Sequence, residues 1–398
     1  MYKLCLLCFL PFLIIATEKA DWPFYRGPDG NSVSKEKDWD PKALEKAKIL
    51  WQKEFGKGYS QVRISGDYML TQGSVPGHNV VYCLKESNAE EIWQFKFKNK
   101  WVDDKYAGCT QTPIIFRNKV YVVSRSGDLY CLSLEKGEVI WHSNLLEKYT
   151  LTTRDRGMCT EIKAWEDDKI FLNAGVNGMM LEADTGKKIW GESGDVRYGT
   201  PVFFKYKGMD CASMFGVKCA FGVDLKTGKR LWEVEWISNP WDTNVPDHIV
   251  VGDKIFLTAL KHKGELFQID GKTMKSLWMT DHLEAQFPTP LYHDGYIYGI
   301  HGKGNSKASL VCLDFETGKL QWTKKIGFGN ISIAGDKLLF NGERGEVKIL
   351  ELNPKAYTEI VSKQLTIKRS VWAPPVLCRG KLYIRSSTGT LICLDMRK

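Results

Sequence analysis

The sequence predicts an all-β fold: an eight-bladed β-propeller of four-stranded blades, whose ring is closed by pairing of the N-terminal strand with the C-terminal strands. Three observations predict it, namely the composition, a repeated tryptophan motif and two complementary chain ends. The chain has 398 residues with 14 Trp and 36 Gly, a combination typical of many short strands joined by tight turns. Its hydrophobic fraction of 43% and charged fraction of 26% are ordinary for a folded protein and exclude global disorder.

The first 16 residues have the pattern of a secretory signal peptide. Lys3 provides a positive charge, an apolar run extends from Leu4 to Ile15, and Ala16 is a small residue at which a signal peptidase could cut. The alternative is a buried N-terminal helix. No other stretch approaches the length of a membrane span, so no transmembrane segment is expected. We therefore predict a periplasmic or secreted protein with a signal peptide at 1–16, an extended N-terminal arm at 17–47 and a propeller at 48–398.

A motif of the form D-x-x-T-G-x-x-x-W recurs along the chain. Counting back from the tryptophan, Gly lies four residues earlier in four copies, Thr five residues earlier in four copies and Asp eight residues earlier in three copies. The residues before the motif are β-prone, Gly supplies the positive φ of a tight hairpin, and an indole suits packing between sheets. The repeat tryptophans are Trp51, Trp93, Trp141, Trp190, Trp232, Trp278 and Trp322.

The spacing and the chain ends complete the prediction. An eighth copy, KILELNPKAYTEI, has Ile360 in the place of the tryptophan, and the eight marks lie 38 to 49 residues apart, which is the period of a propeller blade. The segment 49–55 is a fourth strand without partners, whereas 371–377, 381–386 and 390–395 are three strands without a fourth. Pairing the two ends would remove the open sheet edge.

The cysteines have a structural interpretation. Two of the 11 lie in the predicted signal peptide, and the other nine include no CxxC pair, so neither a zinc site nor a thioredoxin-like site is indicated. Four of them occupy one repeated strand position and are interpreted as small buried residues. These four are Cys83, Cys131, Cys312 and Cys393.

The repeat resembles that of the pyrroloquinoline-quinone-like (PQQ-like) β-propellers over nearly all of residues 48–398. The arm DWPFYRGPDGNSVSKE (21–36) is similar to the opening segment of exported PQQ-like propeller proteins of environmental bacteria such as planctomycetes. The blade starts RYGTPV, PTPLYHDGYIYGIHG and VWAPPVLCRGKLYIRSSTGTLICLD are similar to the same group. The motif is specific for the fold and weak for function, since one fold hosts many activities.

The resemblance implies two classes of function. A BamB-like propeller would be an exported, non-catalytic scaffold that binds a protein partner or small ligand at its mouth without a cofactor, and this is our leading hypothesis. The alternative is a quinoprotein-type dehydrogenase, an oxidoreductase that uses PQQ and calcium at the propeller axis. This chain lacks the adjacent cysteines of that branch, its long insertions and a CxxCH haem motif. No cofactor is therefore expected, and PQQ and calcium belong to the alternative.

The loops that lead into the first strand of each blade form one mouth of the channel. The predicted mouth contains Gln61, Gln111, Glu161, Asn244, Asn330 and Trp372. Glu161 and Asn244 carry the oxygen donors that Ca²⁺ takes, and the resemblance also implies a Glu and an Asn at the quinoprotein site. The next blade start, 286–289, lacks the acid of that site. The alternative is that these polar groups only hydrate the channel or satisfy strand ends.

Other features are less specific. The net charge of +9 has interleaved signs, and the Lys–aromatic alternation of FKFKNKW (95–101) is explained by an outer strand with one wet face as well as by nucleic-acid binding. No nucleic-acid partner is expected, whereas association with the envelope stays open. Residues 154–156 form a charged loop, and polysaccharide binding is a third functional hypothesis. Tryptophans outside the repeat indicate where to look for a site, chiefly Trp22, Trp241 and Trp372.

Overall fold

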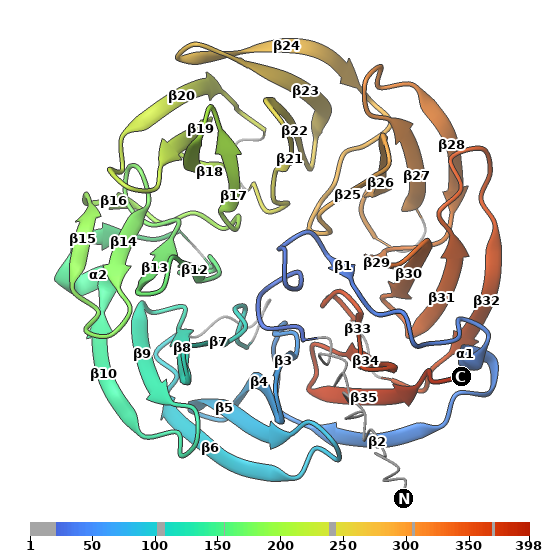
Figure 1. Cartoon of the computed structure of the whole chain (residues 1–398), viewed down its shortest axis with the longest axis horizontal. Helices are drawn as coiled ribbons and strands as arrows, with labels where there is room; N and C mark the ends of the chain where they lie inside the picture. Colours follow the sequence, from blue (N-terminus) through green and yellow to red (C-terminus); the bar gives the residue numbers. More distant parts are fainter. Residues whose placement is uncertain (1–20, 102–107, 155, 239–243, 305–306, 368–370) are drawn as a thin grey trace, which may run out of the picture.

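The computed structural model describes residues 21–101, 108–154, 156–238, 244–304, 307–367 and 371–398. Eight sheets, each with four antiparallel strands, surround a central axis, as Figure 1 shows, and β1 (Val33–Ser34) adds a parallel fifth strand to one of them. In each of the first seven blades the innermost strand comes first in the sequence, and each later strand lies one place further out. The predicted eight-bladed propeller is confirmed. The predicted signal peptide lies outside the described residues.

The first four blades follow one another along the chain. Blade 1 contains β3 (Arg63–Ser65), β4 (Tyr68–Val75), β5 (His78–Lys85) and β6 (Glu91–Lys98). Blade 2 contains β7 (Ile114–Phe116), β8 (Lys119–Val123), β9 (Asp128–Ser133) and β10 (Val139–Asn144). Blade 3 contains β12 (Lys163–Trp165), β13 (Lys169–Leu172), β14 (Met179–Glu182) and β15 (Lys188–Gly191). Blade 4 contains β17 (Val202–Tyr206), β18 (Met209–Phe215), β19 (Cys219–Asp224) and β20 (Arg230–Glu235).

The last four blades complete the ring. Blade 5 contains β21 (Ile249–Val251), β22 (Lys254–Ala259), β23 (His262–Asp270) and β24 (Thr273–Thr280). Blade 6 contains β25 (Leu291–His293), β26 (Tyr296–His301), β27 (Ser309–Asp314) and β28 (Leu320–Lys325). Blade 7 contains β29 (Gly329–Ala334), β30 (Lys337–Gly342), β31 (Glu346–Glu351) and β32 (Glu359–Gln364). Blade 8 contains β33 (Val376–Cys378), β34 (Lys381–Arg385), β35 (Thr390–Asp395) and the outer β2 (Ile49–Glu54).

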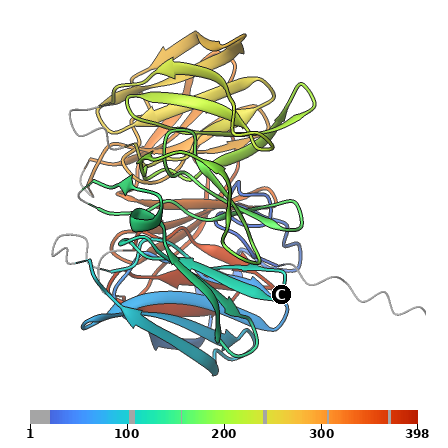
Figure 2. The same cartoon turned by 90° about the vertical axis from the view of Figure 1, so that its left-hand side faces the viewer.

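Blade 8 closes the ring in the predicted way. Strand β2 pairs antiparallel with β35, with Trp51 opposite Cys393. Figure 2 shows the ring from the side. We call the face at which the chain runs into each innermost strand the top face, and the opposite one the bottom face. Among the described residues no helix is long and apolar enough to cross a membrane. The remaining short elements are β1 (Val33–Ser34), α1 (Ala43–Lys46), α2 (Leu145–Lys148), β11 (Leu151–Thr152) and β16 (Gly194–Asp195).

The repeat tryptophans join neighbouring blades. Trp141 of blade 2 lies over the β14–β15 turn of blade 3, so that a Cβ on Gly186 would come within 2.8 Å of its ring. The Trp141 Nε1 also donates a hydrogen bond to the Ala183 carbonyl at 3.0 Å. Three other pairs repeat both contacts, namely Trp93 with Gly137, Trp190 with Gly228 and Trp278 with Gly318. The glycine of the motif therefore provides both a positive φ and the space for the neighbouring blade's indole.

The joint between blades 4 and 5 is built differently. Blade 5 has Met274 in place of the motif glycine, and its β23 and β24 are joined by a tight turn at Gly271 and Lys272. The Lys272 carbonyl accepts a hydrogen bond from the Glu233 amide of blade 4 at 3.0 Å. Trp232 of blade 4 is buried in a cluster that includes Met274. Its Nε1 has no hydrogen-bond partner among the described residues.

A β-bulge precedes the repeat tryptophan on seven outer strands and Val361 on the eighth, so the place of the eighth tryptophan is held by Val361 and the prediction of Ile360 is wrong by one residue. The ladder shifts register at residues 50, 92, 140, 189, 231, 277, 321 and 360. A bulge interrupts the regular row of backbone donors and acceptors on an edge strand. The eight bulges therefore make the rim a poor template for pairing with another chain.

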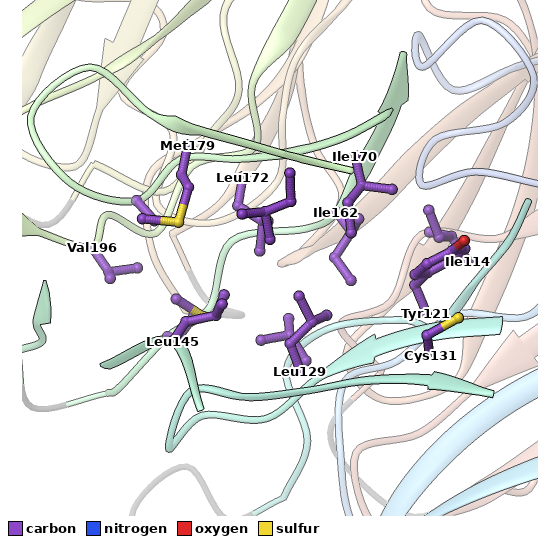
Figure 3. Close-up of a cluster of buried hydrophobic side chains, with 14 of the residues drawn as sticks. Ile114, Tyr121, Leu129, Cys131, Leu145, Ile162, Ile170, Leu172, Met179 and Val196 are labelled. Carbon is purple, nitrogen blue, oxygen red and sulfur yellow. The ribbon is translucent and has the colours of Figure 1, made fainter. Parts of the chain in front are cut away.

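The hydrophobic core is divided among the spaces between blades. Figure 3 shows the cluster between blades 2 and 3, in which Tyr121 and Cys131 of blade 2 pack with Ile170 and Leu172 of blade 3. The four cysteines at the repeated strand position are all buried and unpaired, which confirms their structural interpretation. The strand 91–98 also has the predicted two faces, since Phe97 is buried while its neighbours Lys96 and Lys98 are exposed.

Residues 21–36 of the arm run through the central channel, and the arm then continues to α1, which contacts β32 and β35. Trp22 pairs with Ile64 toward the bottom end of β3. The chain then rises to Arg26, returns as β1 in parallel with β29, and leaves at the bottom face, where the Glu36 carboxylate accepts from the Gly380 amide at 3.0 Å. The arm is the blue trace inside the ring in Figure 1. It blocks the channel from below, which the sequence did not predict.

Candidate functional site

A cavity of about 170 Å³ opens near the axis among the top-face loops. Its walls come from the starts of several blades and its floor includes one residue of the arm. We call this cavity the axial cup. Its aromatic lining is Tyr25, Tyr59, Tyr198, Phe287 and Trp372, and its charged lining is Arg125, Arg156, Glu161 and Asp247.

Glu161 is held at the start of blade 3 and is 4% exposed. Its Oε1 accepts a hydrogen bond from the Thr112 amide of blade 2 at 3.0 Å. Its Oε2 lies 3.6 Å from Nη2 of Arg63 in blade 1. Burial raises the pKa of Glu161 to about 7, although the positive charge of Arg63 opposes this shift. The carboxyl group therefore titrates near neutral pH, which is typical of functional sites and also of buried ion pairs.

Asp247 is a second buried acid of the cup that the sequence analysis missed. Its Oδ1 accepts from the Thr200 amide of blade 4 at 2.9 Å, and its Oδ2 lies 3.3 Å from Nη1 of Arg26 in the arm. Burial raises the pKa of Asp247 above its usual value, with Arg26 opposing the shift. The resemblance predicts an acid at the blade start 286–289, where the sequence has none. Asp247 lies one blade earlier, only three residues after the predicted Asn244, and that proximity was the available signal.

Two cations of this region, Arg63 and Lys163, are withdrawn from water, Arg63 completely and Lys163 in part. Arg63 is 0% exposed, and desolvation lowers its pKa to about 10. Desolvation likewise lowers the pKa of Lys163 to about 8. Tyr25 lies in this group, with the Arg63 guanidinium carbon 5.8 Å from the centre of its ring. Burial raises the pKa of the Tyr25 hydroxyl, so this hydroxyl stays protonated and is a hydrogen-bond donor at neutral pH.

The aromatic wall is centred on Trp372. Its ring stacks on Tyr59, with centroids 5.3 Å apart and planes 22° apart, and it packs against Phe287 at 5.1 Å. The Trp372 carbonyl accepts from Nδ2 of Asn330 at 2.6 Å. Three of the six predicted mouth residues, Glu161, Asn330 and Trp372, therefore line one cavity.

The other three predicted residues do not line the cup. Gln61 donates through Nε2 to the Pro374 carbonyl of the neighbouring blade at 3.2 Å, and Gln111 donates in the same way to the Met158 carbonyl. The Oδ1 of Asn244 accepts from Nε1 of Trp236 at 3.2 Å. The two glutamines thus link neighbouring blades. For them the alternative holds in which polar groups of the mouth satisfy backbone groups at strand ends.

The donor set does not fit the calcium site implied by the quinoprotein alternative. Glu161 is engaged by a backbone amide and by Arg63, and the carbonyl oxygen of the Asn244 side chain already accepts a hydrogen bond. Within the described residues, no group of three or more His, Cys, Asp or Glu side chains could hold a metal ion. A calcium ion needs six to eight oxygen ligands, so this region would have to rearrange to bind one.

The remaining candidates lie apart from the cup or cannot be placed. Trp22 is 1% exposed and packs against Gly27, whose Cβ would lie 2.9 Å from its ring. It therefore anchors the arm. Trp241 and Asp155 lie outside the described residues. Tyr25 and Arg26 of the arm were not predicted as site residues, because nothing in the sequence shows where an extended segment docks.

Comparisons with known proteins agree with this architecture. The family model described as "Outer membrane protein assembly factor BamB" matches residues 40–197 and 221–398. The BamB of Shewanella oneidensis is 22% identical over 335 residues, covering 79% of this chain and 69% of that protein.

Among solved structures, BamB from Moraxella catarrhalis superposes with a TM-score of 0.65 at 14% identity, over 88% of this chain and 99% of that one. A europium-containing methanol dehydrogenase superposes with a TM-score of 0.72 at 11% identity, over 95% of this chain and 98% of that one. At these identities the structural likeness shows a shared fold and does not separate a scaffold from an enzyme. The family model spans most of the chain, and the protein therefore belongs to the BamB family of PQQ-like propellers.

Proposed function

We propose that this BamB-family propeller is an exported, non-catalytic scaffold that binds a protein partner at the axial cup. The observation that carries the proposal is the composition of the cup. Tyrosine, tryptophan and arginine, the side chains that dominate binding energy at protein interfaces, gather there in one recess on the top face. A recess of this kind suits the insertion of a side chain from a partner.

The size and chemistry of the cup support the same proposal. Its volume of about 170 Å³ is below the roughly 300–1,000 Å³ of most small-molecule sites. Its two acids already bind backbone amides and arginines of the chain. Together these features favour contact with a partner over capture of a large cofactor.

We also propose a location in the cell envelope. The matched relative is named an outer membrane protein assembly factor, and the first 16 residues have the pattern of an export signal. A role in outer membrane protein assembly would place the partner in the same compartment.

Site-specific photo-crosslinking tests the protein-binding proposal. A photoreactive residue replaces Arg156 at the cup, or Lys207 at an exposed turn on the bottom face, and the protein is produced in its own host. We expect a discrete crosslinked product from position 156 and none from position 207. With the captured partner purified, Trp372→Ala should weaken binding by about 30-fold, as for a hot-spot residue worth 2 kcal/mol. Equal crosslinking from both positions would contradict the proposal.

Reconstitution tests the enzymatic alternative. The purified protein is incubated with PQQ and calcium, and cofactor binding and dye-linked alcohol oxidation are measured. We expect neither stoichiometric PQQ binding nor oxidation. Stoichiometric binding with turnover would replace the scaffold proposal by the dehydrogenase. Retention of the protein on an insoluble glycan would instead support the polysaccharide-binding hypothesis.

A further inference from the structure

The axis of the propeller contains two buried ion pairs, each with one partner in a different part of the chain. Arg26 of the arm pairs with Asp247 at 3.3 Å, with side chains 6% and 4% exposed. Arg63 of blade 1 pairs with Glu161 of blade 3 at 3.6 Å, with side chains 0% and 5% exposed. Each carboxylate also accepts a hydrogen bond from the amide of a threonine. Glu161 and Asp247 are thus held in the same way, each buried, paired with an arginine and bonded to a threonine amide.

A buried carboxylate needs a positive charge close by, because taking it out of water without one costs several kcal/mol. A metal ion or an arginine can supply that charge. Here both guanidinium groups are fixed in place. Arg26 Nε donates to Oγ of Ser32 at 3.0 Å, and the Ser32 amide donates back to the Arg26 carbonyl at 2.7 Å. Arg63 Nη1 donates to Oε1 of Gln61 at 3.1 Å.

The pairing involving Arg26 depends on the arm. Arg26 follows Trp22, whose backbone pairs with Ile64 through hydrogen bonds of 2.9 and 3.0 Å, and precedes β1, which pairs with β29. These contacts place Arg26 high in the channel beneath the cup. Without the arm, Asp247 would keep its amide donor and lose the arginine paired with it, so that only the more distant charge of Lys163 would remain.

We propose that Arg26 and Arg63 are the counter-cations of the axial acids, so that the seated arm takes the place of a metal ion at the propeller axis. The arm is then part of the site and not only a plug. Its Arg26 is a positioning residue that holds Asp247 at the floor of the cup. This inference rests on the ion pairs and is independent of whether the cup binds a protein.

A double-mutant cycle on Arg26 and Asp247 tests the proposal. Arg26→Met keeps much of the side-chain volume and removes the cation paired with Asp247, so the midpoint of thermal unfolding should fall by roughly 5 °C. Asp247→Asn removes the acid, and the double variant should be more stable than Arg26→Met alone. As a control, Lys205→Met breaks an exposed pair with Asp210 and should leave the midpoint unchanged.

Addition of calcium provides the second part of the test. The wild-type midpoint should not change at about 10 mM calcium, a concentration above the dissociation constants of weak extracellular calcium sites. A wild-type midpoint that rises with calcium, and no longer rises in Asp247→Asn, would overturn the proposal, since a metal would then bind beside the seated arm. Strictly additive effects of the two substitutions would also overturn it.

Proteolysis keeps the proposal testable even where Arg26→Met does not fold. In the wild-type protein the Arg26–Gly27 bond lies inside the channel, so trypsin should cut it slowly. In Asp247→Asn the arm loses its ion pair, and cleavage at this bond should become at least several-fold faster while the other sites keep their rates. Equal cleavage rates in both proteins would show that Asp247 does not hold the arm, contrary to the proposal.

Discussion

The joint between blades 2 and 3 resembles the joint between blades 4 and 5 near the axis. The two joints differ at the rim. Near the axis both use the same bond: the Thr112 amide donates to Glu161 at 3.0 Å, and the Thr200 amide donates to Asp247 at 2.9 Å. At the rim, Trp141 rests on a glycine and bonds to a carbonyl. Trp232 neither packs on a glycine of the next blade's turn nor donates a hydrogen bond to a carbonyl among the described residues.

This difference shows that a propeller joint has two separable sets of contacts. We call the contacts near the axis the inner seam and those at the rim the outer seam. The outer seam depends on the repeat motif, so it changes where Met274 replaces the glycine. The inner seam depends on a Thr-Pro pair at one blade start and an acid at the next, and neither residue belongs to the repeat. One seam can therefore be altered while the other is kept.

The largest expected effect concerns the inner seam and its pH dependence. Glu161 has a folded-state pKa of about 7, above its unfolded value near 4.5, so the folded protein binds this proton more tightly. Its contribution to stability is therefore lost as the pH rises from about 4.5 to about 7, by about 3 kcal/mol in total. Urea unfolding of the wild type and Glu161→Gln between pH 4 and 8 checks this. The stability difference, wild type minus variant, should fall across that window.

An exposed glutamate in a turn provides the control for this titration. Glu135→Gln changes a side chain at the surface of blade 2 and controls for the effect of the substitution itself. If Glu161→Gln gives a flat difference, the carboxyl group does not titrate in this window, and the inner seam of blades 2 and 3 is not pH-dependent.

The next largest effect isolates the outer seam. Gly186 and Gly271 both adopt positive φ, at +67° and +62°, but only Gly186 faces an indole, and Gly271 faces open space. Substitution by alanine costs about 1 kcal/mol at either site because of the backbone conformation. At Gly186 the displaced Trp141 ring adds about 2 kcal/mol. Chemical denaturation of Gly186→Ala and Gly271→Ala measures the difference, and equal losses would mean that the glycine serves only its turn.

The smallest effect separates the two indoles. Trp141→Phe removes the hydrogen bond to Ala183 and should cost about 1 kcal/mol more than the change in ring size alone. Trp232→Phe removes a buried N–H group without a partner among the described residues, so no hydrogen bond is lost. Unfolding free energies of both variants are compared after the cost of the smaller ring is subtracted, which is larger at the fully buried Trp232 than at the partly exposed Trp141. A remaining loss at Trp232 as large as that at Trp141 would place a hydrogen bond in the outer seam of blades 4 and 5.

The outer seam could be predicted from the sequence because it is repeated. The regular tryptophans gave the number of blades, and the unpaired strands at the two ends predicted the pairing of β2 with β35, which is confirmed. The departure at blade 5 was also visible, since Met274 stands four residues before Trp278 in place of glycine. What the sequence could not show was that this glycine lies beneath the tryptophan of the preceding blade.

The inner seam and the site were predicted only in part, because their residues come from distant, non-repeated positions. Glu161, Asn330 and Trp372 were found by counting to each blade start, and they line the cup. Asp247 was missed because it lies at the start of blade 5, whereas the acid was expected at the start of blade 6. Tyr25 and Arg26 were missed because the docking of the arm rests on contacts more than 200 residues apart, such as Arg26 with Asp247, for which local periodicity gives no signal.

The closure of blade 8 also constrains the order in which the protein folds. Strand β2 pairs with β35 across nearly the whole chain, from Ile49 to Leu394, and the arm's β1 pairs with β29. Contacts this distant in sequence make folding slow, and during synthesis the first segments of the chain emerge long before their partners. The arm and β2 are thus made first and paired last, so the fold is finished only once blade 8 has been synthesised and is free to pair with β2.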